Sequence, residues 1–120
     1  MDRLRRKNDI QRALREGRRV HSSGVVLHAL RRATDDSPPD ACRIALVAGR
    51  RFPNAVARNR AKRLLRETSR PLLSDSRGPW DLVFIARQQI LALPAPRRTA
   101  LVSDLLHRAG VLSEEALTSA

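Results

Sequence analysis

The segment from Asn54 to about Arg70 restricts the possible folds of this chain more than any other. When it is wound at the helical period of about 100° per residue, its small and aliphatic residues converge on the side that must be buried: Ala57, Ala61, Leu64, Leu65 and Thr68. Its polar residues converge on the other side: Asn59, Lys62, Arg63, Arg66 and Arg70, with Arg58 and Arg60 on the two flanks. Asn54 can cap the first turn, and Pro71 should end the helix. The rest of the chain must therefore supply an apolar layer beneath this helix.

Three further segments have the apolar pattern of strands: residues 20–32, 43–48 and 80–87. Two more have helical spacing: residues 9–16 and the stretch between Pro96 and Gly110. We expect Gly17 and Gly110 to stop these two helices, Gly17 in a left-handed conformation, and Asn8 or Asp9 to cap the first. The order helix, strand, strand, helix, strand, helix predicts an α+β fold, a two-layer sandwich in which a small mixed sheet carries helices on one side.

The chain is short enough to form one domain. We expect residues 1–112 to make up that domain and residues 113–120 to be a C-terminal tail that can fray. Within the domain, Cys42 has the surroundings of a small core residue, and Asp81 has those of a structural residue at the edge of a strand.

Charge is the second strong feature of the sequence. The chain carries 24 Lys+Arg against 12 Asp+Glu, a formal net charge of +12 at pH 7, and all the cations except Lys7 and Lys62 are arginine. Arginine can hold a phosphate through two hydrogen bonds, although a coding bias toward arginine would produce the same count. Sixteen of the 24 cations fall in the windows 3–19 and 50–70. Such clustering is typical of a protein that binds a polyanion.

The simplest explanation of the basic helix is a solvent-exposed surface with no binding role. Like charges at i, i+3 and i+4 repel by roughly a few tenths of a kcal/mol per pair, and ordinary solvated helices reduce this repulsion by interleaving glutamates. Glu67 is the one acid of the 50–70 window, and we expect it to pair with neighbouring arginines. A contact surface for nucleic-acid phosphate is therefore the better explanation, with further amide donors near Asn54.

No group of residues suggests a catalytic or metal site within the protein. His21, His28 and His107 lack the spacing of metal ligands, and no glycine-rich phosphate loop is present. The lone Cys42 excludes an internal disulfide and suits a reducing compartment. No apolar run approaches the roughly 18 residues that span a bilayer. We expect a cytoplasmic protein with no catalytic residues, bound metal or membrane contact of its own.

One run of residues resembles a known family signature. Asn54-Ala-Val-Ala-Arg58-Asn59-Arg60-Ala-Lys62-Arg63-Leu-Leu-Arg66-Glu67 resembles the arginine-asparagine-arginine motif of the bacterial ribonuclease P protein subunit. The similarity extends to five further places: Lys7-Asn8-Asp9, Gly17-Arg18-Arg19, Val26-Leu27, Arg50-Arg51, and Asp81 with Ile85-Ala86-Arg87. It covers residues 4 to about 112, which is nearly the whole chain.

The resemblance implies a protein subunit of an endoribonuclease. It would bind the catalytic RNA of ribonuclease P and precursor tRNA, and assist removal of the 5′ leader to give the mature tRNA 5′ end. The RNA would perform the hydrolysis with bound Mg²⁺, which is expected in the RNA-containing holoenzyme and not on protein side chains alone. No obligate protein partner is implied. The family fold also implies a left-handed crossover between parallel strands, a rare handedness.

The resemblance also implies roles for particular residues. The RNA-binding set would be Arg50, Arg51, Asn54, Arg58, Asn59, Arg60, Lys62, Arg63 and Arg66. Three of these, Arg58, Lys62 and Arg66, would border a cleft and meet the phosphates of the leader. The cleft itself would be lined by Ile10, Leu14, Val26, His28, Val47 and Ala86.

The family often has aromatic residues at the positions of Ile10, Leu14 and His28. This chain has one Trp, two Phe and no Tyr, and stacking of a base on an aromatic ring contributes about 1 to 3 kcal/mol. We therefore expect this protein to hold the leader more through its cations.

Two other classes of protein compete with this interpretation. A general RNA-binding or ribosome-associated protein would share the charge but not the long signature. A membrane-surface protein would need a bulky apolar helix face, whereas Ala57 and Ala61 make that face small. A salt titration distinguishes RNA binding from nonspecific adhesion, and a tRNA processing assay distinguishes ribonuclease P from other RNA-binding proteins.

Overall fold

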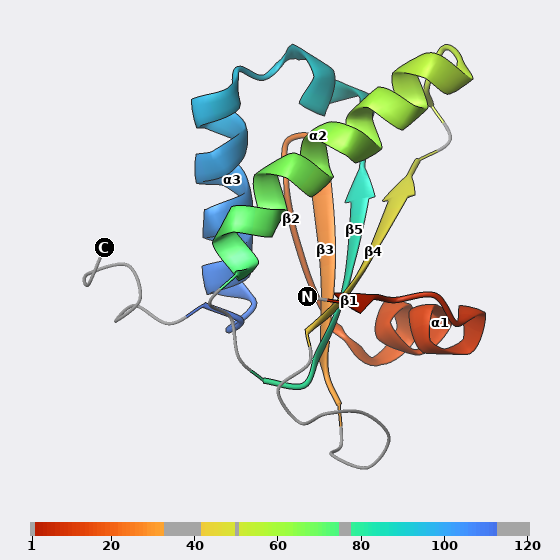
Figure 1. Cartoon of the computed structure of the whole chain (residues 1–120), viewed down its shortest axis with the longest axis vertical. Coiled ribbons are helices and arrows are strands. Elements are labelled where there is room, and N and C mark those ends of the chain that lie inside the picture. The colour runs from red at the N-terminus through yellow and green to blue at the C-terminus, as the bar shows by residue number, and fades with distance from the viewer. Residues whose placement is uncertain (1, 33–41, 50, 75–77, 113–120) are drawn as a thin grey trace.

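The computed structural model describes residues 2–32, 42–49, 51–74 and 78–112. The expected tail, residues 113–120, lies outside this range. Strands and helices follow one another along the chain in this order: β1 (Asp2–Arg3), α1 (Lys7–Glu16), β2 (Arg18–Ser22), β3 (Val25–Arg31), β4 (Arg43–Ala48), α2 (Ala55–Leu73), β5 (Trp80–Ala86), the 3₁₀ helix η1 (Gln88–Ala92) and α3 (Ala95–Arg108). Figure 1 shows α2 lying across one face of the sheet beside α3.

The sheet is mixed, with the strand order β1-β4-β5-β3-β2. Strand β4 runs parallel to both β1 and β5, whereas β3 is antiparallel to β5 and β2. In Figure 1, α2 lies in front of the sheet and the upper end of β5 lies to the left of β4, so the β4-α2-β5 connection is left-handed. The expected α+β class, mixed sheet and crossover are confirmed.

Both faces of the sheet are covered by helices. On one face, Leu27 and Phe84 are buried in a core completed by α2 and α3. On the other face, Ala45 and Val83 pack with Ala13 of α1. The expectation of helices on one side was wrong because successive strand residues are apolar on both faces here, and each face needs a cover.

Helix α2 begins as the sequence predicts. The Asn54 side-chain oxygen accepts a hydrogen bond of 2.8 Å from the backbone N–H of Ala57. The helix passes through Pro71 and ends at Leu73, not at Arg70. A proline in the last turn removes only one backbone donor, and Leu73 is buried, so its packing holds that turn in place.

The segment 20–32, expected to be one strand, is a hairpin formed by β2 and β3. Its turn contains Gly24 at φ +93°, where a Cβ would lie 2.9 Å from the backbone nitrogen of Ile90. Gly17 was wrongly expected to be left-handed: its φ is −71°, and α1 starts at Lys7 without a side-chain cap. Gly110 follows the last helix at φ +83°, as expected.

Candidate nucleic-acid interface

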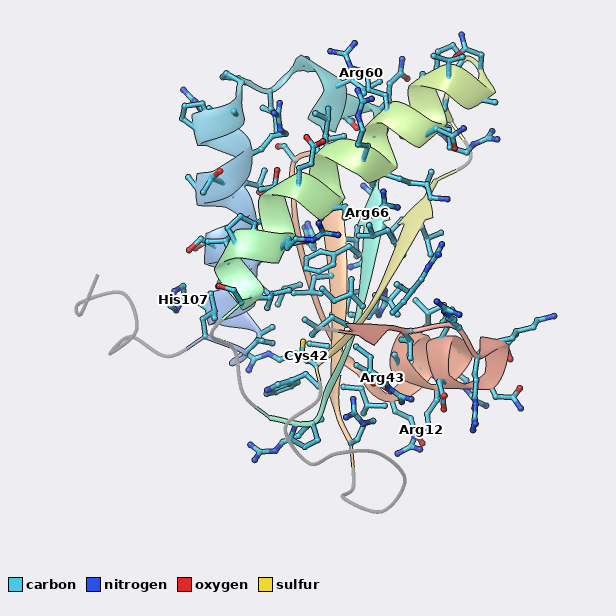
Figure 2. All side chains as sticks on the ribbon, in the orientation of Figure 1. Arg12, Cys42, Arg43, Arg60, Arg66 and His107 are labelled. Atoms are coloured by element: carbon cyan, nitrogen blue, oxygen red, sulfur yellow. The ribbon has the colours of Figure 1, made fainter. Side chains whose placement is uncertain are left out.

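The outer face of α2 carries the cations that its periodicity places there. Most of the polar residues on this face are exposed: Arg58, Asn59, Arg60, Arg63, Arg66 and Arg70, with Lys62 half-buried. Figure 2 marks Arg60 and Arg66 along the helix. The opposite face is anchored in the core through Ala61 and Leu65, both fully buried. The fold therefore holds this row of charges at the surface on a rigid element.

These cations lack an acidic partner among the described residues. Within the described part of the chain, none of Arg58, Lys62 and Arg66 has an acidic partner within 4 Å. Glu67 is exposed and also forms no ion pair there, contrary to the expectation that it pairs with neighbouring arginines. A row of cations that no described acid neutralises is available to an external polyanion.

A groove of about 790 Å³ runs between α2, β4 and the segment that joins β1 to α1. Its apolar lining comes from both sides of the groove: Leu4, Ile10, Ile44, Ala45, Leu46 and Val47. Its polar lining is mostly cationic: Arg3, Arg5, Lys62, Arg66, Ser69 and Arg70. An apolar floor between two cationic walls suits a single-stranded polyanion, because phosphates can meet the walls while bases and sugars rest on the floor.

Some of the expected cleft residues meet at this groove. Ile10 and Val47 line it together with Lys62 and Arg66. Leu14 lies on the same helix as Ile10 but does not line the groove. It is 37% exposed, which leaves much of its apolar side chain open to a ligand.

The other expected cleft residues are placed differently. Val26 and His28 belong to β3 and are 2% and 8% exposed, and neither lines the groove. Ala86 was wrongly assigned to the cleft, because it is fully buried in the core beneath α2 and α3. Its neighbour Ile85 packs instead with the α1 cluster. Alternation along the strand, which separates Phe84 and Ala86 from Ile85, could have revealed this.

A second hollow, of about 1000 Å³, lies beyond the carboxyl ends of β4 and β5. It is lined by Gly49, Arg51, Phe52, Arg87, Gln88, Gln89, Leu91 and Ala92. Arg51 was expected to bind RNA, whereas Arg87 and the two glutamines were not assigned to a site. Arg87 and the two glutamines directly follow β5, whose single charged residue is Asp81. Polar residues directly after such a strand were the sequence signal that could have identified this hollow. Arg50 lies outside the described residues.

Two residues in the core region have shifted proton affinities. Burial lowers the pKa of His28 below its usual value of 6.5, and the nearby charge of Arg19, which faces it across β2 and β3, lowers this pKa further. Among the described residues, the Nδ1 atom of His28 has no hydrogen-bond partner. Burial raises the pKa of the Cys42 thiol to about 11, so this thiol stays protonated at neutral pH and behaves as a core residue.

The described residues contain no group of three or more His, Cys, Asp or Glu side chains placed to hold a metal ion. In the same residues, no helix combines the length and apolar character needed to cross a membrane.

Comparison with known proteins places the chain among relatives of similar length. The profile of the family described as Ribonuclease P matches residues 1–110. The ribonuclease P protein component of Symbiobacterium thermophilum is 37% identical over 113 residues, covering 94% of this chain and 95% of the relative. That of Roseiflexus castenholzii is 38% identical, covering 92% and 87% respectively.

Solved structures share the fold. The RNase P protein of Staphylococcus aureus superposes with a TM-score of 0.77 at 24% identity, covering 94% of this chain and 99% of that one. The RNase P protein of Thermotoga maritima gives a TM-score of 0.73 at 24% identity, covering 90% and 97%.

Proposed function

The chain belongs to the ribonuclease P protein family, and from this we propose that it binds the ribonuclease P RNA along α2 and the 5′ leader of precursor tRNA in the adjacent groove. In this role it is the protein component of an endoribonuclease that matures the 5′ end of tRNA. The observation that carries the proposal is the row of α2 cations that no described acid neutralises, placed beside an apolar floor.

The RNA subunit would contact the outer surface of α2. Each phosphate neutralised by an arginine or lysine releases condensed counterions, and this release supplies much of the free energy of binding. Asn59, Arg60 and Arg63 are all exposed, which supports contact with one continuous RNA surface. The Asn54 side-chain oxygen accepts the cap hydrogen bond, so its part would be to fix the helix start near the RNA.

The leader would lie in the groove. Lys62 and Arg66 would meet its phosphates from one wall and Arg5 from the other, while Ile10 and Val47 would contact bases and sugars. Because aliphatic residues replace the aromatic ones here, base stacking would contribute little and phosphate contacts would dominate. The leader should therefore be held with little base preference.

Hydrolysis would belong to the RNA. We assign Mg²⁺ to the RNA-containing holoenzyme, where it would supply the nucleophile and stabilise charge on the phosphate. The protein would position the leader and reduce phosphate repulsion, which lowers the concentration of Mg²⁺ that the assembly requires. We further propose that residues 1–112 are the functional unit and that the protein acts in the cytoplasm.

The test is reconstitution with the cognate RNA and a precursor tRNA over a range of Mg²⁺ concentrations. We expect the protein to increase cleavage most at low Mg²⁺ and to leave the cleavage position at the mature 5′ end. The Lys62→Gln, Arg66→Gln double variant should lose much of this effect, whereas Arg97→Gln, an exposed arginine of α3 outside the groove, should keep it. RNA binding without any effect on cleavage would instead indicate a general RNA-binding protein.

A further inference from the structure

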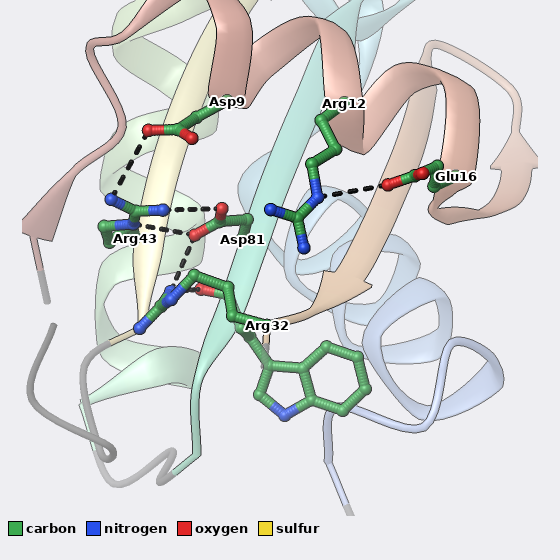
Figure 3. A network of polar contacts seen from close by, with 7 residues as sticks. Asp9, Arg12, Glu16, Arg32, Arg43 and Asp81 are labelled. Carbon is green, nitrogen blue, oxygen red and sulfur yellow. Dashed lines mark hydrogen bonds and ion pairs between the residues drawn. The ribbon is translucent and has the colours of Figure 1, made fainter. Parts of the chain in front are cut away.

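A buried carboxylate joins two arginines beneath α1 (Figure 3). The side chain of Asp81 on β5 is 4% exposed and lies 2.6 Å from Nη1 of Arg32. Arg43 of β4 donates two parallel hydrogen bonds to the same carboxylate, from Nε at 2.8 Å and from Nη2 at 2.7 Å. A side-on pair of this kind fixes the plane of the guanidinium as well as its position.

The remaining nitrogen of that guanidinium reaches α1. Nη1 of Arg43 lies 3.6 Å from the Asp9 carboxylate, and the two side chains are 21% and 24% exposed. Within the described residues, this is the one ion pair that joins α1 to the sheet. The other ion pair of α1, Arg12 with Glu16, lies within the helix, and its side chains are 48% and 58% exposed.

The apolar contact of α1 with the sheet joins four buried residues, Leu4, Ala13, Ala45 and Val83, to three partly buried ones, Ile10, Leu30 and Ile85. Helix α1 has no side-chain cap at its start. Apolar contacts of this kind are non-directional, whereas an ion pair holds two particular groups together. The Asp9–Arg43 pair therefore supplies the directional contact at the first turn.

We propose that Asp9 and Arg43 are positioning residues for the RNA leader: their ion pair fixes α1 on the sheet and so sets the place of the groove's apolar floor. Ile10, which lines the groove, follows Asp9 directly, so any displacement of the first turn moves this side chain relative to Lys62 and Arg66. This inference rests on the proposed binding of the leader in the groove.

The variant Asp9→Asn separates positioning from simple electrostatics. It leaves the Arg43–Asp81–Arg32 contacts in place and raises the formal net charge from +12 by one. Electrostatics alone predicts tighter RNA binding, whereas loss of positioning predicts weaker leader binding. In the reconstituted holoenzyme we expect KM for a precursor with a ten-nucleotide leader to rise about two- to fivefold, the range for a partly exposed ion pair, with kcat unchanged.

Three matched measurements complete the test. Glu16→Gln removes the same charge from the same helix and should leave leader affinity unchanged or slightly higher. Asp9→Glu keeps the charge and should restore most of the wild-type KM. Affinity for mature tRNA and for the RNA subunit alone should not fall in Asp9→Asn, and its thermal unfolding should stay close to that of Glu16→Gln.

The outcomes are distinguishable. Unchanged or tighter leader binding in Asp9→Asn would overturn the inference, as would an equal loss for the leader, mature tRNA and the RNA subunit. If the Lys62→Gln, Arg66→Gln double variant also left leader affinity unchanged, the proposed leader groove itself would be wrong. The inference, which depends on that groove, would then be wrong as well. If that double variant weakened leader binding while Asp9→Asn did not, only the inference would be overturned.

Discussion

The salt dependence of leader binding should decrease when the α2 cations of the groove are neutralised. Lys62 and Arg66 both line the groove, and neither makes an ion pair within the described residues, so replacing both with glutamine breaks no internal contact of that kind. For a single strand, the logarithm of the binding constant falls by about 0.7 per phosphate contact for each tenfold rise in salt. Between 50 and 200 mM salt, each contact then accounts for about a 2.6-fold loss of affinity, and two contacts for about sevenfold.

We therefore expect the wild type to lose about seven times more affinity than the double variant over this salt range. The assay is fluorescence anisotropy of a labelled precursor tRNA, titrated with reconstituted holoenzyme at several NaCl concentrations. A precursor with a leader of one nucleotide is the substrate control, because it leaves the groove empty. Arg97→Gln is the protein control, since this exposed arginine of α3 does not line the groove.

Two results would refute this reasoning. An unchanged salt slope in the double variant would mean that Lys62 and Arg66 contact no phosphate. The same reduction in Arg97→Gln would mean that net charge alone, and not the groove, controls binding. Circular dichroism should show equal helix content in all variants, because the buried side of α2 is untouched.

Three further predictions concern the core and the groove. Asp81→Asn should destabilise the fold by about 3 to 5 kcal/mol, because it removes the buried carboxylate that pairs with Arg32; urea unfolding measures this, and a loss below 1 kcal/mol would contradict a buried pair. The pKa of His28 in the folded protein lies below 6.5, the value in the unfolded chain, so the unfolded state binds the proton first as pH falls. The free energy of unfolding should therefore fall from pH 7 to pH 5 more in the wild type than in His28→Gln. Equal pH dependence in the two proteins would refute it. Leu14→Phe should tighten leader binding about fivefold or more, since this position is 37% exposed and base stacking contributes at least about 1 kcal/mol; unchanged binding by an intact fold would show that the leader does not pass this residue.

Local patterns were sufficient for several elements. The period of α2 separated its buried side from its cationic side, and Asn54 caps it as its residue type predicts. The strand Arg43–Ala48 also matches the prediction. These features depend on neighbours within a few residues, which the sequence contains directly.

Other features depended on contacts between distant segments. The segment 20–32 was expected to be one strand because residues 25–30 are mostly apolar on both faces, yet β3 pairs with both β2 and β5 and the segment folds back as a hairpin. The two-residue β1 has no periodicity and exists because it pairs with β4. Asp81 was expected at a strand edge, yet the pairing of β5 with β3 and β4 brings two arginines to it.

The sequence by itself determined that this protein has a basic amphipathic helix, an α+β composition and the signature of a family, because periodicity, capping and charge are properties of neighbouring residues. Only the tertiary structure decided that α1 covers the opposite face of the sheet, that Ala86 is in the core, and that Asp9 meets Arg43. The physical reason is that burial and ion pairing are set by which surfaces meet in space. Strand order and crossover handedness select those surfaces, and many pairings are compatible with the same local pattern.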